Sequence, residues 1–269
     1  MRIRIAGFGF VGQAMCSVLR NNNEIEIVDP IYNTQDYDPA NPDAVIICVS
    51  TPQSPDGSCD MTNVYDVIAN TDSTIPILIK STISLEGWEC IKHIFPTRKI
   101  CFSPEFLRAD TARTDFATMK YVIIGGDDID NIAYWVDFFN EQTSMWMPAE
   151  DAEEFRIYTC SIPEAITIKY AENSFLALKV SFFNQIYDYC KLTDTDFETV
   201  RTLLCMDTRI GESHSRVTPD RGWGGHCFPK DTAAILKTAD MRGYDMSVLK
   251  SAVDYNKQLR QDELKKKYI

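Results

Sequence analysis

The sequence contains nine cysteines but no C-x-x-C pair. Cysteines paired at that spacing are typical of zinc sites and of thioredoxin-like redox sites, so the sequence predicts no metal site. Most of the cysteines stand in apolar runs such as residues 45–49, which is typical of small core side chains in a reducing compartment.

Basic residues are also scarce, because 27 lysines and arginines stand against 39 acidic residues, which gives a net charge of -12. The one cluster of basic residues is Lys265–Lys267. Binding to a nucleic acid needs clustered lysine and arginine, so we expect no nucleic-acid partner.

Long apolar runs are missing as well. No run approaches the length of a membrane-spanning helix, and the apolar stretch within residues 1–12 is short, broken by glycines and without a cleavage site. We therefore expect a soluble cytoplasmic protein with no membrane partner. Internal repeats and low-complexity tracts are absent too.

Short β-branched runs alternate with helical patterns in the N-terminal part of the chain. The expected strands are residues 3–6, 25–29, 44–49, 75–80, 99–102 and 121–124, and the expected helices are residues 11–20, 62–70, 85–94 and 128–141. This alternation predicts an α/β fold over residues 1–155, a Rossmann-type doubly wound parallel sheet with helices on both faces.

An all-helical domain is expected over residues 156–269. It opens with Ser161–Glu164, a capping-box pattern with Pro163 in the first turn, which predicts one long helix ending near Cys190. Apolar residues surround most of this helix, which indicates a homodimer core and hence a homodimer or larger homo-oligomer. Shorter helices are expected at residues 196–205, 231–241 and 246–266.

Gly7, Gly9 and Gly12 form a G-x-G-x-x-G motif that follows an expected strand and opens an expected helix. Asp29 ends the next strand, where such motifs carry an acid for the ribose hydroxyls. The combination predicts a dinucleotide site, and the carboxylate favours NAD over NADP. A turn residue before Pro30 is the alternative interpretation of Asp29.

Gly222–Asp231, GWGGHCFPKD, places Cys227 among glycines, a proline and charges. Such a loop lets another molecule approach closely, and Lys230 favours the thiolate form. A nucleophilic thiol and a packed loop cysteine are both compatible with these residues. A Cys-His pair is not favoured, because the side chains of adjacent residues such as His226 and Cys227 usually diverge.

Several motifs resemble the UDP-glucose/GDP-mannose dehydrogenase family, in the family's order along almost the whole chain. They are residues 7–12, Ser81-Thr82, Ser103–Arg108, Lys169–Lys179, Asp207–Gly211 and, most specifically, Gly222–Asp231. The resemblance implies an NAD-dependent four-electron oxidation, in which the primary alcohol of a nucleotide sugar becomes a carboxylate. The nucleotide implied is UDP. By this analogy Cys227 forms a thiohemiacetal and then a thioester, which water hydrolyses.

The resemblance also implies roles for individual side chains. Lys169 and Asn173, four residues apart on the long helix, stabilise oxyanion charge, and Lys169 is also placed to transfer a proton. Glu105 activates the hydrolytic water, and Asp231 orders water or the lysine. A local cap after Pro104 is the alternative for Glu105, and an N-cap of the helix that follows is the alternative for Asp231.

The remaining family positions fall into two groups. The cofactor positions are Gly7, Gly9, Phe10, Val11, Gly12, Asp29, Thr51, Ser81, Thr82 and Lys230. The substrate positions are Glu105, Phe106, Leu107, Lys169, Asn173, Arg209, Gly222, Trp223 and Gly224. Arg209 reaches substrate across a subunit boundary in the family, and its alternative is a surface ion pair with Asp207 or Glu212. Lys179 and Asn184 are interpreted as ordinary helix-face residues.

The sequence departs from the family pattern in two places. Ala109 stands where the family usually has an acid, and Asp110 follows it. Family chains continue into a third domain that holds much of the nucleotide, whereas this short form stops at Ile269. Without that domain three alternatives are open. A neighbouring subunit holds the nucleotide, the nucleotide binds weakly, or another substrate takes its place.

Two other functions are compatible with the same plan of domains. The first is a two-electron dehydrogenase of the β-hydroxyacid type, which needs a lysine but no thiol. The second is a catalytically silent NAD-binding module. A β-hydroxyacid dehydrogenase does not need Cys227. A silent module has no use for the five reactive side chains, which are Glu105, Lys169, Asn173, Cys227 and Asp231.

Overall fold

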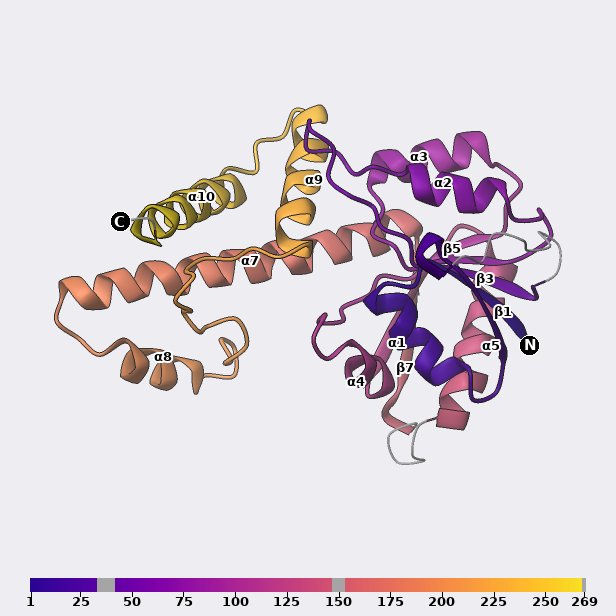
Figure 1. The fold of residues 1–269 in the computed structure, drawn as a ribbon, viewed down its shortest axis with the longest axis horizontal. Coiled ribbons are helices and arrows are strands. Elements are labelled where there is room, and N and C mark those ends of the chain that lie inside the picture. The colour runs from indigo at the N-terminus through magenta and orange to yellow at the C-terminus, as the bar shows by residue number, and fades with distance from the viewer. Residues whose placement is uncertain (33–41, 147–152, 268–269) are drawn as a thin grey trace. The chain divides into compact units, whose positions relative to one another are not determined.

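The computed structural model describes residues 1–32, 42–146 and 153–267. By its internal contacts the chain divides into two compact units. The first comprises Met1–Ser54 and Cys59–Lys169, and the second comprises Pro55–Ser58 and Tyr170–Ile269. The first unit is built around a β-sheet, and the second consists of helices joined by loops (Figure 1).

A seven-stranded sheet with the order β2-β1-β3-β4-β5-β6-β7 forms the centre of the first unit. Its strands are β1 (Arg2–Ala6), β2 (Glu24–Val28), β3 (Ala44–Ile47), β4 (Ile77–Ile79), β5 (Ile100–Phe102), β6 (Tyr121–Gly126) and β7 (Arg156–Cys160). The first five pair in parallel, whereas β6 is antiparallel to β5 and parallel to β7. The carboxyl ends of β1 to β5 therefore lie along one edge of the sheet.

All six strands expected from the sequence are present, but two features differ from the expected parallel sheet. The first is the antiparallel pairing of β6. The second is β7, because residues 156–160 were expected in the helical domain and instead pair with β6 at the edge of the sheet. Burial along β7 is mixed and it contains no continuous apolar run, so its sequence carries only a weak strand signal.

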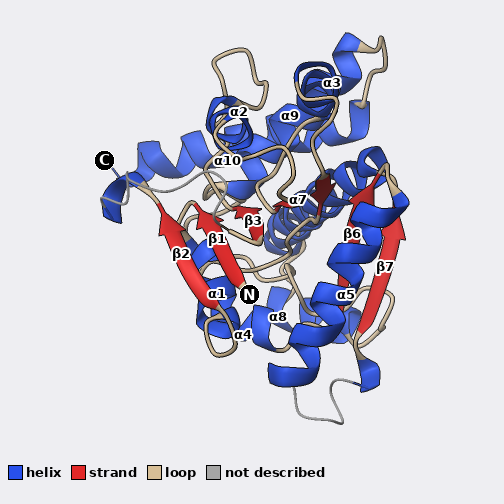
Figure 2. Ribbon diagram, turned by 90° about the vertical axis from the view of Figure 1, so that its right-hand side faces the viewer, coloured by secondary structure: helices blue, strands red, loops and turns tan. Residues whose placement is uncertain are grey.

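Helices cover both faces of the sheet, as the sequence predicts. They are α1 (Phe10–Leu19), α2 (Thr62–Ala69), α3 (Leu85–Ile94), α4 (Ala112–Ala117) and α5 (Ile129–Trp146), with a short 3-10 turn, η1 (Pro30–Tyr32). Helices α2 and α3 lie on one face, and α1, α4 and α5 lie on the other (Figure 1 and Figure 2). On the latter face, Phe116, Trp135 and Phe139 are at most 2% exposed in a continuous core.

The long helix α7 (Ile162–Leu192) has 31 residues and is about 46 Å long at the standard rise per residue. The expected capping box starts it: the Ser161 N–H donates to a carboxylate oxygen of Glu164 at 2.8 Å, and the Glu164 N–H donates to Ser161 Oγ at 3.4 Å. The long helix and its start are therefore confirmed.

The other helices of the second unit are α8 (Phe197–Cys205), α9 (Cys227–Met241) and α10 (Ser247–Lys267). Helix α9 begins four residues before the expected position, at Cys227 itself. The sequence suggested a loop there because of Pro229, but the first turn of a helix tolerates proline, whose missing N–H has no partner to lose. The N-cap prediction for Asp231 is therefore wrong, since Asp231 lies inside α9.

None of the helices within the described residues combines the length and the apolar character that a membrane span needs.

Candidate functional site

The turn between β1 and α1 is shaped by its glycines. Gly7 has φ +90°, and a Cβ there would lie 2.5 Å from the backbone of Cys48. A Cβ at Gly12 would lie 2.2 Å from the carbonyl oxygen of Gly7, so neither Gly7 nor Gly12 has room for a side chain. A Cβ at Gly9 would meet nothing within 4 Å, which leaves open space in front of the α1 N-terminus. Phe10 and Val11 form the first turn of α1 beside it.

Asp29 lies directly after β2, next to this turn. One carboxylate oxygen accepts a hydrogen bond from the Phe8 N–H at 2.7 Å, and the other accepts one from the Ile31 N–H at 2.9 Å. The acid is thus tied to the glycine turn. An open helix N-terminus beside a fixed carboxylate is the arrangement that binds a pyrophosphate and a ribose, so the residues present fit NAD.

Thr51, Ser81 and Thr82 follow β3 and β4, and all three are buried. The Ser81 hydroxyl donates to the Val49 carbonyl at 2.7 Å, which ties the two strand ends together. In parallel sheets ligands bind beyond the carboxyl ends of the strands. The first unit therefore gathers nearly all of the cofactor positions expected from the sequence at one edge of its sheet.

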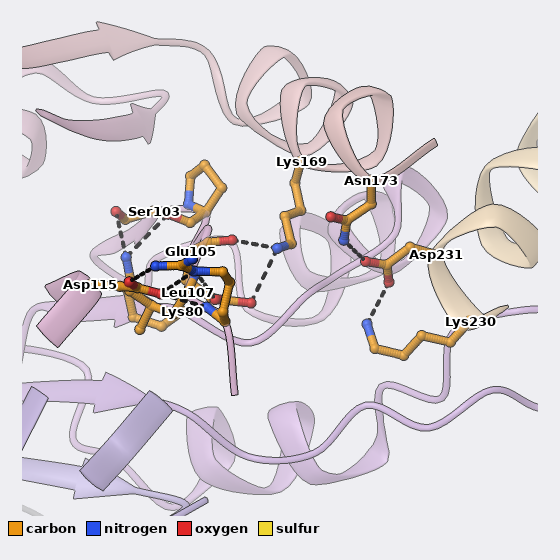
Figure 3. Close-up of polar contacts among 11 residues, drawn as sticks. Lys80, Ser103, Glu105, Leu107, Asp115, Lys169, Asn173, Lys230 and Asp231 are labelled. Carbon is orange, nitrogen blue, oxygen red and sulfur yellow. Dashed lines mark hydrogen bonds and ion pairs between the residues drawn. The ribbon is translucent and has the colours of Figure 1, made fainter. Parts of the chain in front are cut away.

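Glu105 and Lys169 form a buried ion pair in the same unit (Figure 3). The Lys169 ammonium donates to the Glu105 carbonyl oxygen and, at 3.1 Å, to its carboxylate, and the two side chains are 5% and 7% exposed. The second carboxylate oxygen of Glu105 accepts from the Leu107 N–H at 2.9 Å, so the local capping interaction is also present. The Phe106 ring lies 5.4 Å from the ammonium.

The ion pair satisfies two charges that burial alone would strongly disfavour. It also fixes the position of the Lys169 ammonium, which is what an electrostatic catalyst requires. Glu105, Phe106 and Leu107 line a cavity of about 130 Å³ that also borders Lys80.

Lys80 is a second buried lysine near this ion pair, and it was not among the site residues expected from the sequence. Its ammonium donates to Ser103 Oγ at 3.1 Å and to the Pro104 carbonyl at 3.2 Å (Figure 3). Burial lowers the pKa of Lys80 to about 8, although the nearby Glu105 carboxylate acts in the opposite direction. The signal in the sequence was a lysine ending the apolar strand segment 75–80, directly before Ser81.

Asn173, Asp231 and Lys230 form a separate polar cluster in the helical unit (Figure 3). The Asn173 side-chain N–H donates to one carboxylate oxygen of Asp231 at 2.5 Å, and Lys230 contacts the other at 2.5 Å. Asp231 is 1% exposed. The acid thus orients the Asn173 amide, while Lys230, expected at the cofactor, pairs with Asp231.

Cys227 is the first residue of α9 and is half-buried. A helix N-terminus favours a negatively charged group, so this position favours a thiolate over a thiol. Other cysteines lie in different surroundings, because burial raises the pKa of Cys48 and of Cys101 to about 12. None of the nine cysteines forms a disulfide. In the described part of the chain no group of metal-ligating side chains gathers.

The loop before Cys227 is held closely by its neighbours. Gly222 has φ +58°, and Trp223 is buried, with its indole N–H donating to Ser181 Oγ at 3.0 Å. A Cβ at Gly224 would lie 3.1 Å from the Arg260 guanidinium. These glycines therefore allow close packing within the chain.

Arg209 is exposed and pairs with Asp207 at 2.5 Å, which was the alternative interpretation of this residue. Two helix residues were interpreted wrongly as ordinary. The Lys179 ammonium donates to the carbonyls of Ile210 and Gly211 at 2.6 and 3.0 Å, next to Arg209. Asn184 is 1% exposed and bonds to the loop before Cys227. Their spacing gave no sign of this, since both partners come from distant loops.

Comparison with known proteins identifies two matching domains. Residues 30–142 match the NAD binding domain of the UDP-glucose/GDP-mannose dehydrogenase family, and residues 163–258 match the central domain of the same family. The two matches together span more than half of the chain. The UDP-glucose 6-dehydrogenase of Haloferax volcanii is 31% identical over 85% of this chain and 55% of its own length. The chain spans about half the length of the first curated relatives it matches.

Two solved structures show the same fold. A UDP-glucose dehydrogenase from Pyrobaculum islandicum has a TM-score of 0.76 at 23% identity, covering 96% of this chain and 68% of that one. The 3-hydroxyisobutyrate dehydrogenase of Mycobacterium tuberculosis has a TM-score of 0.69 at 14% identity, covering 97% of this chain and 94% of that one. At these identities the likeness concerns the fold alone.

Proposed function

The chain belongs to the UDP-glucose/GDP-mannose dehydrogenase family, and we propose that it oxidises the primary alcohol of a nucleotide sugar to a carboxylate with NAD. The observation that carries the proposal is Cys227 at the N-terminus of α9, where a thiolate is favoured. The alternative two-electron reaction of a β-hydroxyacid has no need of this thiol. A UDP-linked sugar is the proposed substrate, because the curated relatives are named UDP-glucose 6-dehydrogenases.

When bound, NAD would supply the hydride acceptor for the two oxidation steps, one NAD molecule for each step. The glycine turn, with its open space at Gly9, and Asp29 are the residues that would hold it. Thr51, Ser81 and Thr82 line the strand ends next to this turn. Lys230 is the one proposed cofactor residue that comes from the helical unit.

The first step converts the alcohol to an aldehyde. Lys169 passes one ammonium proton to the Glu105 carboxylate and takes up the hydroxyl proton, and Glu105 releases its proton to solvent before the hydrolysis. The Lys169 ammonium and the Asn173 amide donate to the oxygen on which negative charge develops. Their acidic partners, Glu105 and Asp231, keep both donors oriented before substrate arrives. Preorganised donors lower the barrier because they need no reorganisation during the reaction.

In the second step the Cys227 thiolate attacks the aldehyde carbon and forms a thiohemiacetal. Loss of the second hydride from that carbon leaves a thioester on sulfur. Glu105 then takes a proton from water, which attacks the thioester and expels the free thiolate. The carboxylic acid formed loses its proton to solvent and leaves as the carboxylate. The covalent intermediate explains why the aldehyde is not released.

We further propose a homodimer formed along α7. Four large apolar side chains on this helix are exposed and follow each other at intervals of seven residues: Ile168, Phe175, Phe182 and Tyr189. A seven-residue apolar repeat forms a seam that pairs with a second helix of the same kind. An exposed Arg209 is available to the substrate of the partner copy, which is its proposed role.

The proposal is tested by counting NADH. With NAD and limiting UDP-glucose, or one of a panel of UDP- and GDP-sugars, we expect about two NADH per sugar oxidised. Cys227→Ser should stop the reaction near the aldehyde, at about one NADH per sugar, whereas the control Cys90→Ser, which changes an exposed cysteine, should keep the wild-type ratio.

One NADH per molecule in the wild-type chain would support the two-electron alternative instead. An unchanged ratio in Cys227→Ser would remove the thioester from the mechanism.

A further inference from the structure

The loop that carries Cys227 is anchored by an aromatic ring on either side. Trp223 is 7% exposed and packs on α7, where its indole N–H bonds to Ser181. Phe228, directly after Cys227, packs in the same cluster, with its ring centroid 6.3 Å from that of Trp223. Residues 224–227 thus form a short tip between two fixed points.

The backbone just before Trp223 adopts a conformation that needs support. Arg221 has φ +52° and Gly222 has φ +58°, so two successive residues are in the left-handed region. An arginine is rarely found there, and such strained backbone persists only where surrounding contacts hold it. A Cβ at Gly222 would lie 2.2 Å from Asn256 Oδ1, so the neighbouring helix α10 comes very close.

Asn184 on α7 provides the first of these contacts. Its side-chain oxygen accepts hydrogen bonds from Arg221 Nε at 2.8 Å and from the Gly222 N–H at 3.1 Å. Its side-chain nitrogen donates to the Val180 carbonyl at 2.9 Å, which fixes the orientation of the amide. Asn184 therefore holds both left-handed residues at once.

Asn256 on α10 provides the second contact. Its side-chain oxygen accepts from the Trp223 N–H at 2.7 Å, and its side-chain nitrogen donates to the Trp223 carbonyl at 3.0 Å. The amide thus pairs with both polar groups of one backbone residue, as a neighbouring strand would. Asn256 is 7% exposed, so water does not compete freely for these bonds.

Arg221 joins the two helices. Besides bonding to Asn184, its guanidinium pairs with Asp188 at 2.8 Å and lies 4.7 Å from the Tyr187 ring centre. Its carbonyl accepts from the Arg260 guanidinium of α10 at 3.3 Å. The residue is 9% exposed, so its charge is held almost entirely by these partners.

We propose that Asn184, Arg221 and Asn256 form a loop clamp whose role is to position the Cys227 thiol for attack on the substrate carbon. This inference rests on the proposed function. The three are positioning residues: Asn184 and Asn256 contact the loop backbone, Arg221 is part of the loop, and none of them contacts the reacting atoms. A nucleophile misplaced by about 1 Å loses much of its rate, so a loop without regular secondary structure needs such support.

The test compares Asn256→Ala with Leu249→Ala, which removes a buried side chain from the same helix outside the cluster around Trp223. The first readout is the rate of alkylation of Cys227 by iodoacetamide at pH 7, followed by mass spectrometry of the peptide. We expect Asn256→Ala to lower this rate by about fivefold, because without support from the loop the first turn of α9 unwinds and Cys227 no longer lies at a helix N-terminus. In Leu249→Ala the rate should stay within about twofold of wild type.

The second readout is turnover. In Asn256→Ala we expect kcat to fall by about tenfold while KM for NAD stays within about twofold, because the clamp touches no part of the glycine turn. Asn256→Asp keeps the acceptor for the Trp223 N–H and loses the donor, so it should lie between wild type and Asn256→Ala. If Asn256→Ala does not fold, Asn256→Asp takes its place in both measurements.

The inference is overturned if Asn256→Ala alkylates at the wild-type rate, or if Leu249→Ala loses as much kcat as Asn256→Ala does. The two proposals fail separately. A wild-type chain that alkylates as expected but forms no NADH refutes the proposed function, and the alkylation comparison still decides whether the clamp exists.

Discussion

At the scale of single residues, Lys80 shows how burial changes the behaviour of a charge. Its ammonium is enclosed between Ser103 and Pro104, and burial lowers its pKa to about 8. In the unfolded chain a lysine has a pKa near 10.4. The unfolded state therefore binds more protons than the folded state between about pH 8 and 10.4, and in this range the contribution of Lys80 to stability increases with pH.

The free energy of unfolding should therefore depend on pH in a way that is lost in the variant Lys80→Met. Relative to Lys80→Met, the free energy of unfolding of the wild-type chain should rise by about 2 kcal/mol between pH 8 and 9.5. Urea denaturation of both chains at several pH values measures it, and each chain's other titrating groups cancel in the difference. A constant difference over this range would mean that Lys80 titrates as an exposed lysine does.

Other residues show what a sequence reveals about a site. Lys169, Glu105, Asn173 and Asp231 were identified through motifs, and the structure pairs them two by two. Lys80 and Asn184 were missed, because each acts on backbone groups of a segment far away in the chain. No local pattern marks a side chain whose partner is a distant carbonyl or N–H.

At the scale of elements, the turn between β1 and α1 separates two uses of glycine. A methyl group at Gly12 collides with the carbonyl of Gly7, which is backbone and cannot move aside easily. A methyl group at Gly9 meets open space. Gly12 is therefore required by the fold, whereas Gly9 leaves space for a ligand.

Two alanine variants test this distinction. Gly12→Ala should destabilise the chain by about 2 kcal/mol or more through overpacking. Gly9→Ala should change stability by less than about 1 kcal/mol, yet lower the affinity for NAD by about tenfold or more because its methyl group blocks the pyrophosphate. Chemical denaturation and calorimetric titration with NAD measure the two effects. Unchanged NAD affinity in Gly9→Ala would place the pyrophosphate elsewhere.

Elements with a strong periodic or apolar signal were predictable, whereas α4 and β7 were not. The capping box and 31-residue length of α7 leave a strong periodic signal, as do the buried parallel strands. The six residues of α4 are too few for a pattern, and β7 has one partner strand and mixed burial. The start of α9 was misplaced because proline and glycine occur both in loops and near the first turn of a helix. Their presence therefore does not show where the helix begins.

At the scale of the whole molecule, the exposed seam along α7 predicts the oligomeric state. Phe175 and Phe182 are 63% and 50% exposed, and burying them against a second copy would remove a large apolar area from water. We expect the wild-type chain to sediment as a dimer at micromolar concentration. Phe175→Glu or Phe182→Glu should raise the dissociation constant by about thirtyfold or more.

The matched control is Val248→Glu, which places the same charge at a side chain of α10 that is 72% exposed. It should remain dimeric. A monomeric wild-type chain, or a Val248→Glu variant that dissociates as readily as Phe175→Glu, would contradict an interface at this seam.

The buried thiols have a consequence for the handling of the protein. A sulfur such as Cys101, whose pKa is raised to about 12, stays protonated at neutral pH and reacts slowly with peroxide. Oxidative damage in a stored sample should therefore begin at the accessible sulfurs and spare the interior. Inactivation by mild oxidants, reversed by dithiothreitol, would then report on the state of the α9 sulfur while the sheet stays intact.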